Sequence, residues 1–334
     1  MSLDFWRENN FRLEPWSTDY QPPIEIQELS SSESEVNHGV EETNWSDFIS
    51  QKRVSPELPQ KLVFIDGRRR MDAALVGGAG NTINYGVFGT IAVGAVVVDR
   101  SKHTAKCDRI TIHRILGFGG NQKAPEETFI PCPLGSKTEL VYLPVKPHLD
   151  NKPEIRRKLV QTEMLKAETI LVDSFAREQN TLIVRDGPLS YNSSPSTLGY
   201  VKTMHKNYLD GKHATLLWEL QPGERTPIFG IQDKNQPLWS WYLKSGNSQI
   251  SSHKLGYHDL HGIVRLELSS EVDLEEAKLI ADQTTYLIPE YSSHPYKDPR
   301  APQNLIPVGA LERELGRRMG RRLQHFLGSI GVVL

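Results

Sequence analysis

The sequence contains very little cysteine, because only Cys107 and Cys132 occur among its 334 residues. Two cysteines exclude a disulfide-rich scaffold and a four-cysteine zinc ribbon, and they suit a reducing compartment. A large excess of positive or negative charge is also missing, since the formal net charge is only −2 at pH 7. Without a general basic excess, any contact with nucleic acid must depend on local positive patches.

Long hydrophobic runs are absent as well. No stretch reaches the roughly 18 consecutive apolar residues of a transmembrane helix, and the first residues lack the basic and apolar regions of a signal peptide. The Walker, dinucleotide-binding, nucleophile-elbow and His-Glu-x-x-His motifs are also missing. These absences predict a cytoplasmic protein, away from membranes, that does not itself hydrolyse ATP.

Residues 1–60 differ in composition from the remainder and are predicted to form a partly flexible N-terminal extension. Short helices are predicted over 3–13 and 44–53, and the polar, acidic segment 27–35 between them is typical of flexible chain. The aromatic residues of the extension pack either on the main domain, predicted to span 61–334, or on a partner. The sequence alone leaves both alternatives open.

The most informative stretch is Lys61–Gly67, in which four apolar residues lead into Asp66 and a glycine. Such a run predicts a buried strand that ends in a carboxylate. The pattern recurs at Thr181–Gly187, which carries Asp186. Taken alone, each Asp-Gly pair is ordinary turn chemistry. Two predicted strand-end carboxylates in one chain are nevertheless the best indication of a functional site.

Hydrophobic periodicity predicts the remaining elements. Further strands are expected over 71–76, 85–99, 107–116, 140–145, 214–220, 238–244 and 261–268. Helices are expected over 153–179, 196–210, 274–288 and 309–327, with a proline-rich loop over 286–307. This order predicts an α/β fold with a mixed sheet flanked by helices. Within that class, a ribonuclease H-like arrangement gathers acidic residues from the first strand, a helix and the fourth strand.

Converging carboxylates suit a divalent-metal site for phosphodiester hydrolysis, because Mg²⁺ and Mn²⁺ prefer oxygen ligands. Asp66 and Asp186 are the first candidates, and the helix predicted over 153–179 adds Glu163 and Glu168 at the borders of its apolar stripe. For either glutamate alone, a solvated side chain paired with a neighbouring base is the plainer interpretation. Lys202, in a predicted helix, is placed to hold a scissile phosphate, or is simply a surface lysine.

Candidate nucleic-acid contacts lie in two places. Three consecutive arginines, Arg68, Arg69 and Arg70, follow the first Asp-Gly pair and are predicted to contact phosphates. In the predicted loop, Tyr291 and Arg300 are candidates for stacking on bases and binding phosphates, and His294 is a candidate general acid or base. A proline-braced surface loop explains the same residues equally well.

Five short motifs occur in the order found in the NurA nuclease family, which this chain resembles over roughly 61–318. They are Phe64–Gly67, Leu182–Leu189, Gly199–Lys202, Gly262–Glu267 and Pro307–Leu311. The resemblance implies a ribonuclease H-like, Mn²⁺- or Mg²⁺-dependent nuclease that processes single-stranded DNA and DNA ends in recombinational repair. It also implies a homodimer that works beside a hexameric HerA-type ATPase.

The resemblance also assigns site residues. It implies that Asp66 and Asp186 are metal ligands, that Glu168 or Glu163 supplies the helix carboxylate, and that Lys202 corresponds to the family's lysine after the second aspartate. Two departures stand out. Arg68 takes the place of a small residue, and the stretch 307–314 lacks the family's late histidine, for which the upstream His294 is the candidate substitute.

Three hypotheses follow for the function. The first is a metal-dependent DNA nuclease with an Asp/Glu/Asp site. The second is a non-catalytic scaffold or DNA-binding subunit of a HerA-type ATPase, suggested by the missing late histidine and the aromatic extension. The third is an RNA-directed ribonuclease H-fold nuclease, because the choice between DNA and RNA depends on contacts to the 2′-hydroxyl group, which the sequence does not specify.

Overall fold

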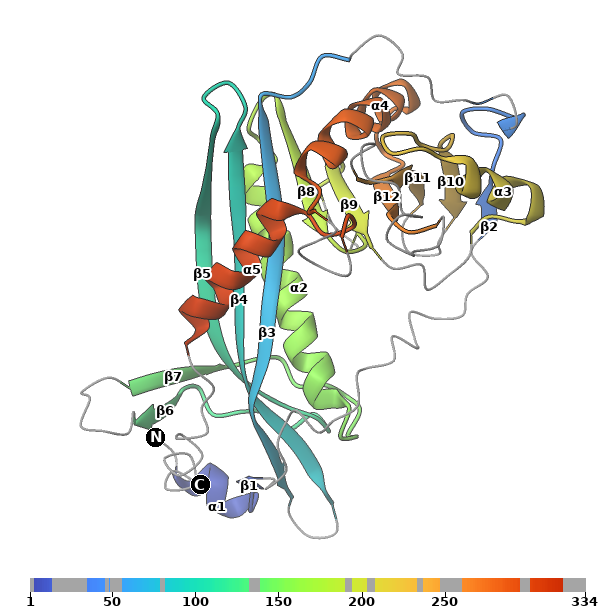
Figure 1. The fold of residues 1–334 in the computed structure, drawn as a ribbon. Coiled ribbons are helices and arrows are strands. Elements are labelled where there is room, and N and C mark those ends of the chain that lie inside the picture. The colour runs from blue at the N-terminus through green and yellow to red at the C-terminus, as the bar shows by residue number, and fades with distance from the viewer. Residues whose placement is uncertain are drawn as a thin grey trace.

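The chain is a mixed α/β protein with one large, mostly antiparallel sheet flanked by helices (Figure 1). This is the predicted fold class, and the structure, a computed structural model, confirms it. The described residues are 3–13, 35–45, 48, 56–78, 82–131, 139–189, 194–202, 208–232, 237–246, 260–294 and 301–320. No helix among them is long and apolar enough to cross a membrane.

The centre of the sheet has the ribonuclease H-like strand arrangement. Three long strands, β3 (Lys61–Gly77), β4 (Asn84–Asp99) and β5 (Thr104–Phe118), form an antiparallel meander. On the other side of β3, β8 (Thr181–Asp186) and then β9 (Thr197–Val201) join in parallel. The first and fourth strands of this core, β3 and β8, are therefore direct neighbours.

Further strands extend both sides of this core. Beyond β9 the order is β12 (Ile263–Ser269), β11 (Leu238–Lys244), β10 (Phe229–Gln232) and β2 (Glu35–Asn37). Beyond β5 it is β7 (Glu139–Pro144) and β6 (Thr128–Pro131), and β1 (Arg12–Leu13) pairs with the far end of β3. The sheet is thus built from segments distributed over nearly the whole described chain.

Helices cover both faces of the sheet. The long helix α2 (Ile155–Phe175) lies on one face, and α4 (Leu274–Tyr291) and α5 (Ile306–Met319) lie on the other (Figure 1). Because side chains alternate along a strand, Val63 and Ile65 of β3 pack with α2, whereas Phe64 packs in the core that holds α4 and α5. The two shorter helices are α1 (Leu3–Glu8) and α3 (Gly211–Glu219).

The described parts of the N-terminal extension pack on the main domain, which answers the question left open for its aromatic residues. Trp6 and Phe11 are buried beside β4 and β5, with the Phe11 ring 4.6 Å from that of Phe118. Trp45 is buried near α3 and β10. The polar segment 27–34 and most of the helix predicted over 44–53 lie outside the described residues, and the domain boundary at residue 60 stays a prediction.

The strand predicted to end at Asp66 does not end there. β3 continues to Gly77, so residues 71–76 are strand as predicted, but they continue β3 and do not form a separate strand. The physical reason is that the first Asp-Gly pair makes no turn: Gly67 stays in register with Val93 of β4. Only the second pair, at Asp186, terminates its strand. The edge that exposes the site is therefore created by the end of β8 beside a continuing β3.

Two predicted elements have the opposite secondary structure. The helix predicted over 196–210 is wrong in its first part, which is strand β9, whose Thr197, Leu198 and Tyr200 are buried between β8 and β12; residues 203–207 lie outside the described residues. The strand predicted over 214–220 is also wrong, because this segment lies in α3 and buries only one side, through Leu217. In both segments, tertiary contacts outweigh local propensity.

Two other boundaries change the placement of candidate residues. Helix α4 continues through Pro289 to Tyr291, so Tyr291 belongs to a helix and not to the predicted loop. Helix α5 begins at Ile306, earlier than the predicted residue 309, with a proline in its first turn, where a missing N–H is tolerated. The predicted continuation of this helix from residue 321 to 327 lies outside the described residues.

Candidate metal centre

Three carboxylates meet where β8 ends beside β3. The parallel register places Ile65 opposite Arg185, so the next residues, Asp66 and Asp186, are neighbours on the same face of the sheet. That face is covered by α5, which contributes Glu312. One carboxylate oxygen from each of Asp66, Asp186 and Glu312 lies within 4.8 Å of the others. The structure thus brings together the two aspartates selected from the sequence and adds a third acidic group.

A fourth carboxylate, Glu168, approaches from the opposite face on α2. Its Oε2 atom accepts two hydrogen bonds from Arg185, from Nε at 3.0 Å and from Nη2 at 2.7 Å. The other oxygen, Oε1, lies over Gly67, where a Cβ atom would collide with it and would also come within 2.9 Å of Cγ of Met164. Glycine after Asp66 is therefore required so that Glu168 can approach the group.

The crowding of negative charge has a strong effect on Asp66, whose side chain is buried. The pKa of Asp66 is raised to about 8, first by burial and then by the charges of Asp186, Glu168 and Glu312. The pKa of Glu168 is also raised, mainly by burial and against the influence of Arg185. Both shifts mean that the group carries more negative charge than its surroundings stabilise. A bound divalent cation would relieve this excess, so the residues fit a metal site.

Lys202 lies directly after β9 and donates a hydrogen bond from Nζ to Oδ2 of Asp186 at 2.8 Å. Because β9 is parallel to β8, this lysine comes to the same end of the sheet as the aspartate. Its side chain is partly exposed, with 19% of its surface accessible. The ammonium group is thus next to the carboxylates and also reaches solvent.

The other candidates for the centre lie elsewhere. Glu163 pairs with Lys166 at 2.6 Å on the accessible side of α2, which favours Glu168 as the helix carboxylate of this group. His294 is exposed and is not part of the acidic group. The stretch 307–314, in which a late histidine was expected, supplies Glu312 instead, and the sequence patterns did not single this residue out. Glu312 gave only a weak signal in the sequence, because an acidic residue on an exposed helix flank is common.

The three consecutive arginines do not act as one patch. Arg68 and Arg70 turn toward α5, where they donate to the backbone oxygens of Glu312 at 3.2 Å and Gly320 at 2.8 Å. Arg69 points to the other face and donates to Gln161 of α2. Arg68 and Arg70 are therefore engaged in holding α5 over the sheet. Contact of the three arginines and of Tyr291 with DNA stays a prediction. Arg300 lies outside the described residues.

The loop that follows Asp186 is anchored by Glu267 of β12. Oε2 of Glu267 accepts a hydrogen bond from the backbone N–H of Leu189 at 2.9 Å. Gly199 of β9 lies between them, since a Cβ atom there would be 3.0 Å from Cγ of Leu189 and 3.3 Å from Cβ of Glu267. Glu267 is buried, so this contact fixes the chain three residues beyond the second aspartate.

Gly67→Ala is expected to weaken divalent-metal binding strongly and to reduce stability moderately. The new methyl group displaces the Glu168 carboxylate and presses on Met164, and such overpacking typically costs about 1–3 kcal/mol. Urea unfolding and metal-binding assays of the variant measure the two effects. The matched control is Gly211→Ala in α3, where a Cβ atom meets nothing within 4 Å and stability should be unchanged or higher. Equal behaviour of the two variants would contradict the close approach of Glu168 to Gly67.

Comparison with known proteins gives likenesses of structure. The fold is similar to that of a NurA nuclease. The structure of the NurA nuclease from Sulfolobus solfataricus aligns with 81% of this chain and over 86% of the NurA chain, with 11% sequence identity and a TM-score of 0.41. The catalytic domain of human Endonuclease V matches 80% of this chain and 87% of its own, with 12% identity and a TM-score of 0.35. No protein-family model matches the chain, and no curated protein matches it in sequence.

Proposed function

We propose that this protein is a divalent-metal-dependent nuclease that hydrolyses phosphodiester bonds in DNA. The observation that carries the proposal is the convergence of Asp66, Asp186 and Glu312, with Glu168 adjoining them and the pKa of Asp66 raised to about 8. Clustered carboxylate oxygens are the donor set that Mg²⁺ and Mn²⁺ prefer. A structural role alone would not favour a buried carboxyl at Asp66, because a carboxylate buried among like charges costs stability.

Asp66, Asp186 and Glu312 would hold the cation, and Glu168 would add a carboxylate oxygen next to it. When bound, the metal supplies polarisation of the phosphate and a nucleophile of lowered pKa. Arg185 keeps Glu168 oriented through two hydrogen bonds to Oε2, while Oε1 lies over Gly67, the residue after Asp66. Lys202 donates from Nζ to Asp186 and would bind a phosphate oxygen of the substrate.

The substrate and partners are less directly supported. DNA, with single-stranded segments and ends as preferred substrates, follows from the resemblance of the motifs to NurA nucleases, and Mn²⁺ is the cation that the same resemblance favours. The homodimer and the HerA-type ATPase partner stay predictions. Glu312 supplies an acidic group in the segment where the late histidine was missing, which weakens the motive for a non-catalytic scaffold. An RNA substrate is distinguished by direct comparison in the assay below.

The decisive experiment is digestion of end-labelled DNA by the purified chain with Mn²⁺, with Mg²⁺ and with a chelator. The wild type is expected to degrade DNA only with a divalent cation, and Asp66→Ala should be inactive. Identical activity of both proteins would overturn the assignment. If the wild type shows no activity and calorimetry detects no Mn²⁺ binding up to about millimolar concentration, the scaffold hypothesis is favoured. Matched RNA oligonucleotides test the third hypothesis.

Glu312→Gln tests the residue that the sequence did not reveal. It is expected to lower nuclease activity and Mn²⁺ affinity by about 10- to 100-fold, the range found when groups supporting a metal site are changed. The matched control is Glu314→Gln on the same helix, because Glu314 pairs with Arg317 and Arg318 away from the centre. That control should retain activity. If both variants behave like the wild type, Glu312 is not part of the metal centre.

A further inference from the structure

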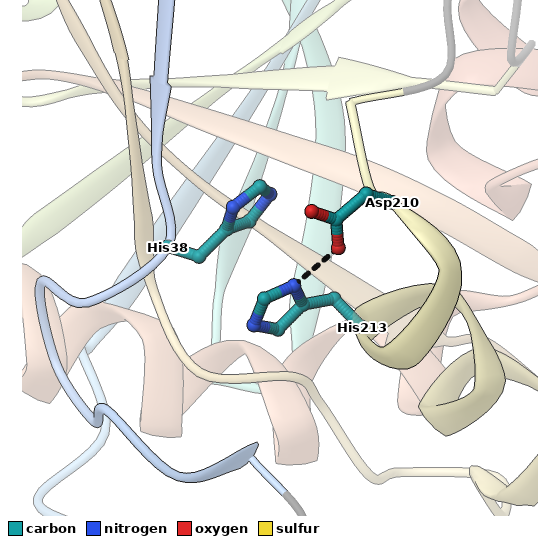
Figure 2. A group of neighbouring side chains, drawn as sticks. All are labelled: His38, Asp210 and His213. Atoms are coloured by element: carbon teal, nitrogen blue, oxygen red, sulfur yellow. Dashed lines mark hydrogen bonds and ion pairs between the residues drawn. The ribbon is translucent and has the colours of Figure 1, made fainter.

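A second group of metal-ligating side chains lies away from the acidic centre, between the N-terminal extension and α3. His38 directly follows strand β2, Asp210 directly precedes α3, and His213 lies in the first turn of that helix. Figure 2 shows the two imidazole rings and the carboxylate facing one another. One potential ligand atom from each of the three residues lies within 4.8 Å of the others. Residues far apart in the chain therefore converge at this point.

The two rings are held in place by their neighbours. The imidazole rings of His38 and His213 are stacked, with centroids 4.3 Å apart and an interplanar angle of 14°. The buried Trp45 packs edge-on against His213 at 4.6 Å and donates from Nε1 to the backbone oxygen of His38 at 2.9 Å. Nε2 of His38 lies 2.9 Å from the backbone oxygen of Tyr208. These contacts hold the two rings beside each other, and because the nitrogen lone pairs lie in the ring planes, one ring would have to tilt for both to reach a single ion.

The charge of the group also suits a cation. Nδ1 of His213 and Oδ1 of Asp210 are 2.6 Å apart, and this hydrogen bond lowers the pKa of Asp210. Asp210 is therefore ionised at neutral pH. Its side chain is 72% exposed, whereas that of His213 is 24% exposed, so solvent reaches one side of the group. That open side leaves space for water molecules as additional ligands.

We propose that His38, Asp210 and His213 form a second metal site that takes a first-row transition cation, with Zn²⁺ as its natural probe. Two imidazole nitrogens and one carboxylate oxygen are an established donor set for such ions. This set differs from the all-carboxylate centre, which suits Mn²⁺ or Mg²⁺. To bind the cation, each imidazole offers the lone pair of one ring nitrogen and keeps a proton on the other, and Asp210 offers a carboxylate oxygen.

The effect of this ion would be to fasten the N-terminal extension to the main domain. His38 belongs to the extension, whereas Asp210 and His213 belong to the main domain, so only the folded arrangement presents all three ligands. An ion that binds the folded state alone raises stability as its concentration exceeds the dissociation constant. The proposal is independent of the nuclease activity, since none of the three residues belongs to the acidic centre.

The test is a Zn²⁺ titration of the full chain by calorimetry and by thermal unfolding, with excess Mg²⁺ present to occupy the acidic centre. The wild type is expected to bind a single Zn²⁺ at the group and to unfold at a higher temperature when it is bound. His213→Gln and His38→Gln, which lie on different elements, should each weaken Zn²⁺ binding at least 10-fold and remove the thermal shift. Mg²⁺-supported nuclease activity of the two variants should be unchanged.

The matched control is His148→Gln, because His148 also lies near an aspartate, with Nδ1 3.8 Å from Oδ2 of Asp150, but belongs to no three-residue group of the described chain. This variant should bind Zn²⁺ like the wild type. The proposal is overturned if the wild type binds no Zn²⁺, or if both glutamine variants bind it as tightly as the wild type. In either case the two histidines and Asp210 form only a packing and hydrogen-bonding contact.

Discussion

Asp66→Asn is expected to make the metal-free protein more stable while it abolishes metal-dependent activity. Asparagine keeps the shape of the side chain and an oxygen that can accept the 2.8 Å hydrogen bond from the N–H of Gly67. It removes a carboxyl group whose ionised form is disfavoured by burial and by the charges of Asp186, Glu168 and Glu312, so that the folded state no longer has to hold a proton there or bury a charge. Activity should fall more than about 100-fold, because changes of mere supporting groups at metal sites already cost 10- to 100-fold. Urea unfolding and DNA digestion measure the two opposite effects.

The gain in stability should depend on pH in a defined direction. The pKa of Asp66 is about 8 in the folded chain, whereas an unfolded aspartate has a pKa of about 4. Between these values the folded state holds a proton that the unfolded state has lost, so the stability of the metal-free wild type falls as pH rises, by at most about 1.4 kcal/mol per pH unit from this group. Above the folded-state pKa, the contribution is constant. Asp66→Asn should lack this slope.

Asp72→Asn is the matched control on the same strand, and its effect should have the opposite sign. Asp72 is fully buried but accepts from Arg70 at 2.7 Å, from Tyr142 at 2.9 Å and from Thr90. Its charge is therefore satisfied, and replacing it should destabilise the protein by about 1–3 kcal/mol. If Asp66→Asn is destabilised to the same degree as Asp72→Asn, the excess negative charge at the centre is refuted.

Arg185→Met should produce the largest loss of stability among single changes at the centre. Arg185 and Glu168 are almost completely buried, with 2% and 3% of their side chains exposed, and their closest atoms are 2.7 Å apart. Without the arginine, Glu168 is left as a buried carboxylate near two aspartates, and breaking such a pair costs about 3–5 kcal/mol. The expected result is a marked fall in the urea midpoint together with loss of activity.

The control for this prediction is an exposed ion pair on the same helix. Lys166→Met breaks the pair between Lys166 and Glu163, whose lysine side chain is 55% exposed, and should cost less than about 1 kcal/mol. The double variant Arg185→Met/Glu168→Gln removes both charges and should regain part of the stability of the single variant, but none of its activity. Equal losses of stability for Arg185→Met and Lys166→Met would show that the buried ion pair stabilises the protein no more than the exposed one.

Local sequence patterns predicted the parts of the site that depend on local structure. The apolar runs before Asp66 and Asp186 identified β3 and β8, because a buried strand leaves a short and nearly continuous hydrophobic signal. The helix between them was recognised from its apolar stripe, with ends at Ile155 and Phe175 in the structure. The expected fold class gathers carboxylates from the first and fourth strands of the core, and in the structure these strands, β3 and β8, are paired in parallel.

The missed features depend on contacts between distant segments. Glu312 approaches the aspartates because α5 is held over β3 by its buried apolar residues and by hydrogen bonds from Arg68 and Arg70, and no spacing within the sequence encodes that contact. Strand β9 was mistaken for a helix because its burial comes from its neighbours β8 and β12. The choice between Glu163 and Glu168 likewise required the position of Arg185, since both glutamates border the same apolar stripe.

The pairing of the N-terminal extension has a consequence for the order in which the chain folds. Strand β2, near residue 36, pairs with β10, near residue 231, so its partner is synthesised only after most of the chain. Forming such a distant pair requires closure of a very long loop, which slows folding. The meander of β3, β4 and β5 uses far shorter connections and can form first. The extension is therefore expected to dock last, and Trp45 fluorescence should report a late kinetic phase.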